Sequence, residues 1–481
     1  MNVTEKISAL VDNKDEKFKE LANKVWEFAE TRFDEFRSAD LLSNALEDEG
    51  FTLERDVAGL ETGFIASFGK GKPVIGILGE YDALASLSQK SGSSSYDPVT
   101  PQGNGHGCGH NLLGVGSLAA AVAVKDYMET NDLSGTVKYF GCPAEESGYG
   151  KAFMAREGVF DSLDVAFSWH PYTMNTVAHT SSNAVIHATF TFKGRSAHAA
   201  AAPHLGRSAL DAVELMNIGV NYMREHMIDD ARVHYAVTNS GGLAPNVVQK
   251  EAEVTYLIRS PKPEQVQNLY KRVENIARGA ALMTETELEH QIEGSCHNLI
   301  PNSALERVMH QQMKELGFPE LDDQDIAFAK AIYHTFSDED RETAKSSLDK
   351  EFASKLDERP IADVILPYSD QLSFMTGSTD VGNVSWNVPT AQCYTSTWAF
   401  ATPFHTWQVV AQGKQNYAHQ GMLLAGKTMA CTAIRVLEDK ELLSQAQEEF
   451  KNRLDGDQYE SLIPQDLQPP RHNSPEVVGV E

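Results

Sequence analysis

The sequence predicts an α/β fold with an inserted α+β domain, and three observations support this. In the first third of the chain, short apolar runs that end in polar residues alternate with helical stretches, which is typical of an α/β domain. Further along, the expected elements follow in the order β-α-β-β-α-β, the order of a ferredoxin-like module. The chain has 481 residues, which favours two domains because about 100 to 200 residues per domain is usual.

The first domain is expected to consist of a buried sheet covered by helices. Residues 11–47 place apolar side chains at helical spacing, which predicts two amphipathic helices. The apolar runs 73–79, 136–140 and 165–169 predict buried strands, and the alanine-rich segment 112–128 predicts a helix packed closely on them. Open α/β sheets bind ligands beyond the carboxyl ends of their strands, so the polar residues that follow these runs mark a candidate site.

The inserted domain is expected at residues 184–298, with residues 1–183 and 299–481 forming the catalytic domain. Proline stands at the expected start of the second helix of the insert, where a missing N–H costs little. The predicted elements of the insert are a strand at 185–192, a helix at 207–225, strands at 233–238 and 251–259, a helix at 261–283 and a strand at 285–292.

The remainder of the chain is expected to be mainly helical. Residues 337–359 are highly charged and poorly patterned, which indicates an exposed helical excursion or a mobile loop. Residues 417–437 predict a packed helix. Residues 463–481 contain several prolines and few apolar groups, which predicts a loosely held tail.

Composition limits the classes of partner and the compartment. The formal net charge is −27, so the surface repels phosphate backbones and anionic lipids, and neither nucleic acid nor membrane is an expected partner. The five cysteines are odd in number and scattered, which argues against a disulfide framework. Because the N-terminus resembles no secretion signal and no run of 18 apolar residues occurs, we expect a cytoplasmic protein.

The segment 106–111, His-Gly-Cys-Gly-His-Asn, places Cys108 and His110 among glycines, whose flexible backbone lets two side chains converge on one ion. Taken alone it could be a glycine-rich turn, a redox turn or a structural zinc loop. Thiolate, imidazole and carboxylate bind divalent metals, and two ions need about five to seven protein ligands. Further candidates at the ends of predicted strands or in loops are Glu145, Glu146, His170 and His405.

Several motifs resemble the aminoacylase/carboxypeptidase family of co-catalytic metallohydrolases, and the similarity spans nearly the whole chain. They are Gly-His-Gly-Cys-Gly-His-Asn at 105–111, Pro-Ala-Glu-Glu-Ser at 143–147, Ser-Trp-His-Pro at 168–171, Gly-Arg-Ser-Ala-His-Ala-Ala at 194–200 and Thr-Pro-Phe-His-Thr-Trp at 402–407. The resemblance implies a metallopeptidase-type catalytic domain with a central mixed sheet and an inserted ferredoxin-like lid and dimerisation domain.

The resemblance also implies roles for individual residues. Glu145 would be the general base, and Asp82 would orient a metal ligand, although it could equally cap the turn that follows. His106 would be a rim or second-sphere group. Two ions, manganese or zinc, would be held by Cys108, His110, Glu146, His170 and His405.

Three residues of the inserted domain complete the expected site. The resemblance implies that His198 stabilises the tetrahedral oxyanion, often from the partner subunit of a dimer. Asn246 and Arg259 would lie near the substrate carboxylate. Asn111 and Thr379 depart from residues common in the family, which puts in doubt a role for Asn111 in supporting the ligands and a direct role for Thr379.

Within the family, segments 78–84, 203–213, 239–242, 245–249 and 377–382 resemble one group of the p-aminobenzoyl-glutamate hydrolases, that of the B-subunits. This implies hydrolysis of an N-acyl amino acid, with p-aminobenzoyl-glutamate as the specific expectation, by a homodimer formed through the lid or by a hetero-oligomer with a related subunit. The alternatives are a dipeptidase or acyl-aspartate hydrolase, a largely non-catalytic companion subunit, and a binding protein with a structural metal site.

Overall fold

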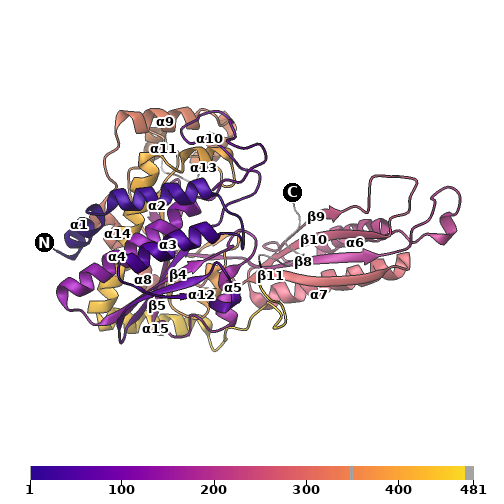
Figure 1. Cartoon of the computed structure of the whole chain (residues 1–481), viewed down its shortest axis with the longest axis horizontal. Coiled ribbons are helices and arrows are strands. Elements are labelled where there is room, and N and C mark those ends of the chain that lie inside the picture. The colour runs from indigo at the N-terminus through magenta and orange to yellow at the C-terminus, as the bar shows by residue number, and fades with distance from the viewer. Residues whose placement is uncertain (1, 347, 349, 472–481) are drawn as a thin grey trace.

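The computed structural model describes residues 2–346, 348 and 350–471. Figure 1 shows a thick α/β body and a slender extension that projects from it. The body contains both terminal parts of the described chain, and the extension contains β8 to β11 with α6 and α7. The predicted α/β fold with an inserted α+β unit is confirmed.

The body is built on a seven-stranded mixed sheet. Strands β4, β3, β5 and β13 are parallel neighbours, so their carboxyl ends meet at one edge, whereas β1, β2 and β6 pair in antiparallel fashion. The order is β1 (Thr52–Arg55), β2 (Phe64–Lys70), β4 (Gly135–Cys142), β3 (Val74–Glu80), β5 (Val165–Tyr172), β13 (Thr390–Ser396) and β6 (Thr176–Val177).

Both faces of this sheet are covered. Alternate residues of β3 enter different cores: Ile75 and Ile77 pack with the N-terminal helices, α4 and α14, whereas Leu78 packs with α5. Burial on both faces explains why the strands are continuous apolar runs. The helices of the body are α1 (Val3–Asp12), α2 (Asp15–Phe28), α3 (Phe36–Asp48), α4 (His110–Asn131), α5 (Gly150–Arg156), α8 (Ser303–Leu316), α9 (Asp323–Tyr333), α10 (Asp338–Lys345), α11 (Lys350–Glu358), α12 (Val381–Ser385), α13 (Trp407–Gln412), α14 (Asn416–Glu438) and α15 (Lys440–Leu454), with the short η1 (Val57–Gly59).

Helix α4 packs unusually closely on the sheet, as its small residues predict. A Cβ atom at Gly116 would lie 2.8 Å from the ring of Trp169, and one at Gly114 would lie 2.6 Å from the carbonyl oxygen of Glu80. The helix begins at His110, directly after Gly109 with its left-handed φ of 76°. This close packing brings the start of α4 to the carboxyl edge of the strands.

The extension is a four-stranded antiparallel sheet with two helices on one face. The helices α6 and α7 share a core with the sheet that is separate from the cores of the body. Helix α7 begins at Pro263, two residues later than expected, with Lys262 as its N-cap. The sheet order is β11 (Glu287–Cys296), β8 (Ala184–Lys193), β10 (Glu251–Ser260) and β9 (Arg232–Asn239), with α6 (Ala209–Met223), α7 (Pro263–Thr284) and the short η2 (Pro203–Leu205) and η3 (Arg224–His226).

The structure of the described residues decides two expectations about the C-terminal half. Segment 337–359 contains α10 and α11, and Leu356 is buried, so the helical alternative is correct. The loosely held tail is wrong for residues 463–471, because Ile463 is buried and Arg156 donates to the carbonyl oxygens of Pro464 and Leu467 at 2.9 and 2.6 Å. Residues 472–481 lie outside the described part. A small parallel pair joins β7 (Thr180–Ser182), from the first half of the chain, to β12 (Ser373–Met375).

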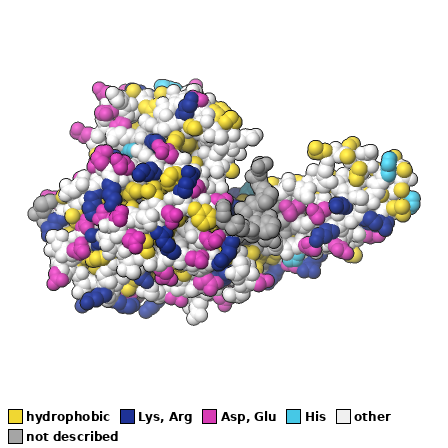
Figure 2. All heavy atoms as spheres, in the orientation of Figure 1, with side chains coloured by type: hydrophobic (Ala, Val, Ile, Leu, Met, Phe, Trp, Pro, Cys, Tyr) yellow, Lys and Arg dark blue, Asp and Glu magenta, His cyan; other side chains and the backbone are white. Residues whose placement is uncertain are grey.

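The surface is charged and mixed in sign. Figure 2 shows acidic and basic side chains interspersed over the visible face of the body, while apolar side chains gather toward the far end of the extension. Among the described residues, no helix combines the length and apolar character needed to cross a bilayer.

Candidate metal centre

The candidate ligands meet where the parallel strands end. Glu145 and Glu146 follow β4, His170 lies near the end of β5, and Cys108 and His110 stand at the start of α4. The fifth predicted ligand is His405, from the loop before α13. Segments separated by almost 300 residues therefore supply one cluster, at the edge where α/β sheets bind ligands.

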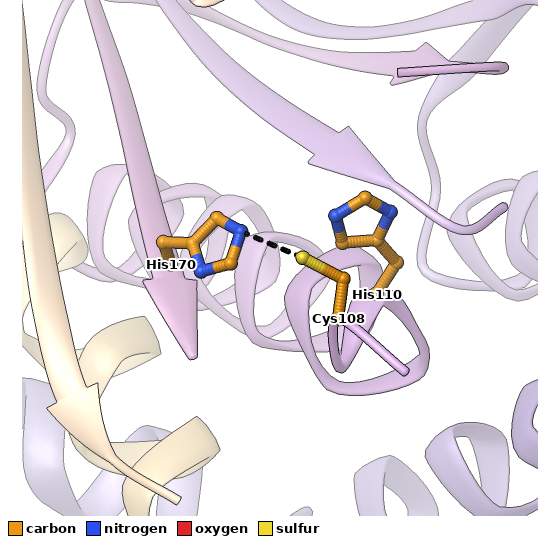
Figure 3. Close-up of side chains that lie close together, drawn as sticks. All are labelled: Cys108, His110 and His170. Atoms are coloured by element: carbon orange, nitrogen blue, oxygen red, sulfur yellow. Dashed lines mark hydrogen bonds between the residues drawn. The ribbon is translucent and has the colours of Figure 1, made fainter. Parts of the chain in front are cut away.

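Cys108 is common to two groups of potential ligands. The donor atoms of Cys108, His110 and His170 all lie within 4.8 Å of one another, and so do those of Cys108, Glu146 and His405. The Sγ atom of Cys108 is 3.5 Å from Nε2 of His170, and Figure 3 shows it pointing toward that ring with His110 on its other side. The structure thus brings together all five predicted ligands around one sulfur atom.

The unsatisfied atoms of these side chains fit divalent ions. Within the described part of the chain, Glu146 Oε1 is buried without a hydrogen-bond partner, and His110 Nε2 is buried and makes no hydrogen bond, although Glu80 Oε2 lies 3.3 Å from it. Buried polar atoms are normally hydrogen-bonded, so such atoms need another partner. Their combination with a thiol and further imidazoles is the donor set expected for zinc-like or manganese-like ions.

Backbone geometry fixes the two ligand loops to each other. His405 has a left-handed φ of 59°, a conformation that non-glycine residues seldom adopt and that is common at functional sites. Its N–H donates to the carbonyl oxygen of Gly107 at 2.9 Å. A Cβ atom at Gly107 would lie 2.5 Å from the end of the Leu87 side chain and 3.4 Å from Cα of His405, so a larger residue here would force Leu87 to move.

Asp82 holds two of the candidate ligands. Its Oδ1 lies 2.8 Å from His110 Nδ1, and its Oδ2 accepts a hydrogen bond from the backbone N–H of Glu146 at 2.9 Å. Asp82 is almost completely buried. The contact leaves His110 Nε2 facing the cluster, which is how carboxylates orient metal-binding imidazoles.

The candidate ligands differ in their pKa values. Burial and the neighbouring Glu146 carboxylate raise the pKa of Cys108 well above its usual range. Burial opposes the charged form of His110, but Asp82 and Cys108 raise its pKa well above normal. Burial would raise the pKa of Glu146, whereas the hydrogen bond with His405 and the charge of His110 lower it to about 2. Burial, together with His110, lowers the pKa of His170 to about 4.

Glu145 differs from its neighbour. Burial raises its pKa well above normal, and the negative charges of Glu80, Asp380 and Glu146 raise it further. One of its oxygens lies within 4.8 Å of donor atoms of Glu80 and His110. Two adjacent carboxylates therefore have opposite proton affinities, which is the condition for a ligand beside an acid or base.

Three charged residues beneath the cluster were not predicted as site residues. Lys151 Nζ lies 2.6 Å from Glu80 Oε1 and 2.6 Å from Asp380 Oδ1. All three side chains are buried. Burial disfavours the charged lysine, but Asp380 and Glu80 raise its pKa well above normal. Glu80 could be noticed as the polar end of a strand, whereas a single lysine in 150–156 gives no signal in the sequence.

His106 is not a rim group. It is almost fully buried, its Nε2 lies 2.9 Å from the carbonyl oxygen of Val25, and burial lowers its pKa to about 3. It belongs to neither group around Cys108. His106 therefore ties the ligand loop to α2.

Within one chain, the structure separates the predicted residues of the extension. Arg259 lies opposite Val185 at the end of β8 near the body, and its Nη1 donates to Ser378 Oγ at 3.0 Å. His198 and Asn246 lie beyond the other end of β8, where Ala199 N donates to Asn246 O at 3.0 Å. Ten strand residues span about 33 Å, and Figure 1 shows β8 projecting away from the body. Residues beyond the far end of β8, such as His198 and Asn246, therefore do not reach the cluster of their own chain.

This fold and this site are those of a metallohydrolase: a mixed α/β sheet carries thiol, imidazole and carboxylate groups that could hold metal ions at its strand ends, with a second carboxylate of high proton affinity beside them. Comparison with known proteins gives the family. The sequence profile of peptidase family M20/M25/M40 matches residues 76–333. The chain belongs to this family and is a hydrolase.

Individual relatives of this chain support the family assignment. The chain is 49% identical over 461 residues to the B-subunit of p-aminobenzoyl-glutamate hydrolase from Escherichia coli, covering 94% of this chain and 96% of the relative. It is 30% identical over 463 residues to a mouse Xaa-Arg dipeptidase, covering 93% and 92%. The fold is shared with a dinuclear metal-binding peptidase of the M20 family from Bacillus subtilis, at a TM-score of 0.53 and 17% identity over 89% of this chain and 99% of that one.

Proposed function

We propose that this hydrolase cleaves the amide bond of an N-acyl amino acid, and that its substrate is p-aminobenzoyl-glutamate, released as p-aminobenzoate and glutamate. The observation that carries the proposal is the pair of ligand groups sharing Cys108, with Glu145 beside them. The similarity to the B-subunit of p-aminobenzoyl-glutamate hydrolase supports the specific substrate.

The proposed cofactors are two divalent ions, manganese or zinc. One would be held by Cys108, His110 and His170, the other by Cys108, Glu146 and His405, with Asp82 orienting His110. When bound, such ions polarise a carbonyl group and lower the pKa of water. The dinuclear centre named for the fold neighbour supports the number of ions.

Glu145 is proposed as the general base. Its raised pKa lets it accept a proton from the attacking water and return that proton to the leaving amide nitrogen. Glu146, with a pKa of about 2, stays ionised and serves as ligand. The two carboxylates thus divide the roles of base and ligand.

An aromatic group lines the site on the side of His170. The ring of Phe404 lies 5.5 Å from that of His170 and 5.8 Å from that of Tyr172, on which it stacks. Tyr394 lies 5.8 Å from Tyr172. Phe404 is 40% exposed, so one face is open to a flat acyl group, and aromatic pairs of this kind favour an aryl ring by about 0.5 to 1.5 kcal/mol.

Cationic side chains at the base of the extension support an acidic leaving group. Arg259 and Arg232 are directly opposite on β10 and β9, and His234 is two residues further along β9. No ion pair joins either arginine to a carboxylate among the residues that the structure describes. Arg259 lies near the site, because its Nη1 donates to Oγ of Ser378, two residues before the buried Asp380 that contacts Lys151. These charges favour glutamate over an arginine-containing dipeptide.

The extension is proposed to be a lid and dimerisation domain of residues 184–298, with residues 1–183 and 299–481 forming the catalytic domain. Because His198 and Asn246 do not reach the metal ligands of their own chain, we propose that they act from the partner subunit of a homodimer. Exposed apolar side chains on the extension, Tyr222 and Leu282 among them, support such contacts. A hetero-oligomer with a related subunit is the alternative assembly.

Three other functions remain as candidates, and one assay separates them. A dipeptidase is supported by the similarity to the Xaa-Arg dipeptidase. A companion role is supported by the name of the bacterial relative, which describes it as one subunit of a hydrolase. The acyl-aspartate hydrolase differs only in the leaving amino acid.

We also propose a cytoplasmic location, since all five cysteines are free and buried.

The experiment loads the purified chain alone with manganese or zinc and compares release of p-aminobenzoate with release of amino acids from dipeptides and acyl-aspartates. We expect p-aminobenzoate release to be fastest, at a rate that chelation abolishes. No release from p-aminobenzoyl-glutamate, with turnover of dipeptides, would replace the proposed substrate. Inactivity toward all of them, restored by a related subunit, would favour the companion role.

A further inference from the structure

The buried charge cluster of Glu80, Lys151 and Asp380 touches the metal centre through one residue. Glu80 Oε2 lies 3.3 Å from His110 Nε2, while Glu80 Oε1 contacts the lysine ammonium at 2.6 Å. The backbone N–H of Lys151 donates to Asp380 Oδ2 at 2.9 Å, so both Asp380 oxygens face this lysine. A rigid link therefore runs from α12 through α5 to the ligand on α4.

Burying these three charged side chains costs free energy, which suggests that they serve a purpose other than stability. Lys151 and Asp380 have fully buried side chains, and Glu80 is nearly so. Removing such charges from water costs several kcal/mol per ion, and buried ion pairs are often no more stabilising than apolar residues of similar size. Stability alone is thus a weak explanation for a lysine at this position.

A third group of potential metal ligands explains it better. The donor atoms of Glu80, His110 and Glu145 also lie within 4.8 Å of one another. His110 belongs both to this group and to the group with Cys108 and His170, and Nε2 is the ring nitrogen that the contact of Nδ1 with Asp82 leaves available. An ion at the third position would take His110 away from Cys108 and would bind Glu145, which could then no longer act as a base.

We propose that the Lys151 ammonium acts as a built-in cation that occupies Glu80 and keeps divalent ions out of the Glu80, His110 and Glu145 position. One Glu80 oxygen is engaged by the ammonium, and an ion on the other oxygen would be repelled by the fixed positive charge nearby. Lys151 is therefore a positioning residue: it directs the ion to the Cys108 side of His110 and leaves Glu145 free. This inference rests on the proposed two-ion centre.

The test counts ions per chain by mass spectrometry after saturation with manganese and removal of unbound metal. The wild type should hold two ions. The Lys151→Met variant should hold a third, and its kcat should fall at least 10²-fold with little change in KM, because Glu145 becomes a ligand instead of a base. Lys151→Arg retains the positive charge and should return to two ions.

Two further variants separate this effect from general damage. Lys151→Met combined with Glu80→Gln removes both charges and should hold two ions. Lys125→Met, which removes a largely buried lysine paired with Asp126 and Glu129 toward the end of α4, should match the wild type in ion count and turnover.

The inference is overturned if Lys151→Met keeps two ions and wild-type turnover. Should that variant fail to fold, crystals of the wild-type protein soaked in manganese decide the matter: two ions and none bound by Glu80 are expected, and an ion on Glu80 would contradict the inference. A wild type with fewer than two ions would instead overturn the proposed metal centre, and this inference with it.

Discussion

The carboxylate of Asp82 fixes the imidazole of His110, with Oδ1 2.8 Å from Nδ1. This contact determines which nitrogen faces the cluster: Nδ1 is taken, so Nε2 is offered to an ion. The other oxygen of Asp82 holds the backbone of Glu146. One buried carboxylate thus orients a ligand of each proposed ion, although it binds neither.

Replacing Asp82 by asparagine should weaken metal binding. An asparagine of the same shape lacks the charge that supports His110, and loss of such a partner typically costs 10- to 100-fold in metal affinity. Competition with a chelator measures the change. Asp97→Asn, which removes an exposed carboxylate paired with Lys90, is the matched control and should bind as the wild type does; equal affinity in both variants would contradict the role of Asp82.

Removing the proposed base should abolish turnover but keep the metal. Glu145→Gln should lower kcat by about 10²-fold or more, since general-base catalysis contributes at least this much, while two ions remain. The neighbouring Glu146→Gln variant should instead lose an ion, because the carboxylate of Glu146 stays ionised as a ligand. If both variants lost metal equally, the division of roles between the two carboxylates would be wrong.

Metal binding should release protons and strengthen as the pH rises. The raised pKa values of Cys108 and His110 mean that both carry a proton at pH 7 in the metal-free protein, and both must lose it to bind an ion. His170, with a pKa of about 4, releases none. In the Glu145→Gln variant, which removes that carboxyl's own titration, calorimetry in buffers of different ionisation enthalpy should give about two protons. Release of none would show that these groups are not ligands.

Mixed dimers test the partner role of His198. His198→Ala and Glu145→Gln should each be inactive as homodimers. When the two chains are unfolded and refolded together, half the dimers combine one chain of each kind, and one of the two sites in such a dimer is intact, so activity should recover to about one quarter of the wild-type value. No recovery would mean that His198 acts within its own chain or not at all.

Much of this architecture was predictable because local patterns determine it. The ligand strands are apolar runs ending in polar residues, and the order of elements in 184–298 appears directly in the alternation of side chains. Strand β13 and helix α15 were missed. The segment 390–396 contains threonine, glutamine and cysteine, and its strand is specified by pairing with β5 rather than by its own apolar character.

The candidate site likewise contains residues that the sequence could predict and residues that it could not. Residues in motifs with adjacent ligands, such as Cys108 with His110, could be predicted because the chemistry lies within a few positions of sequence. Lys151 could not, since its partners Glu80 and Asp380 stand 71 and 229 positions away and only the fold brings them together. The separation of His198 from the cluster could not be predicted from the sequence either, because it depends on the direction in which β8 leaves the body.

The central claim is that Cys108 would contribute to the binding of both divalent ions, and anomalous X-ray diffraction from crystals grown with manganese tests it most directly. We expect two peaks per chain, both in contact with Cys108 Sγ, one of them also with His110 and His170, and the other with Glu146 and His405. A single ion, or two ions of which one does not touch Cys108, would contradict the account.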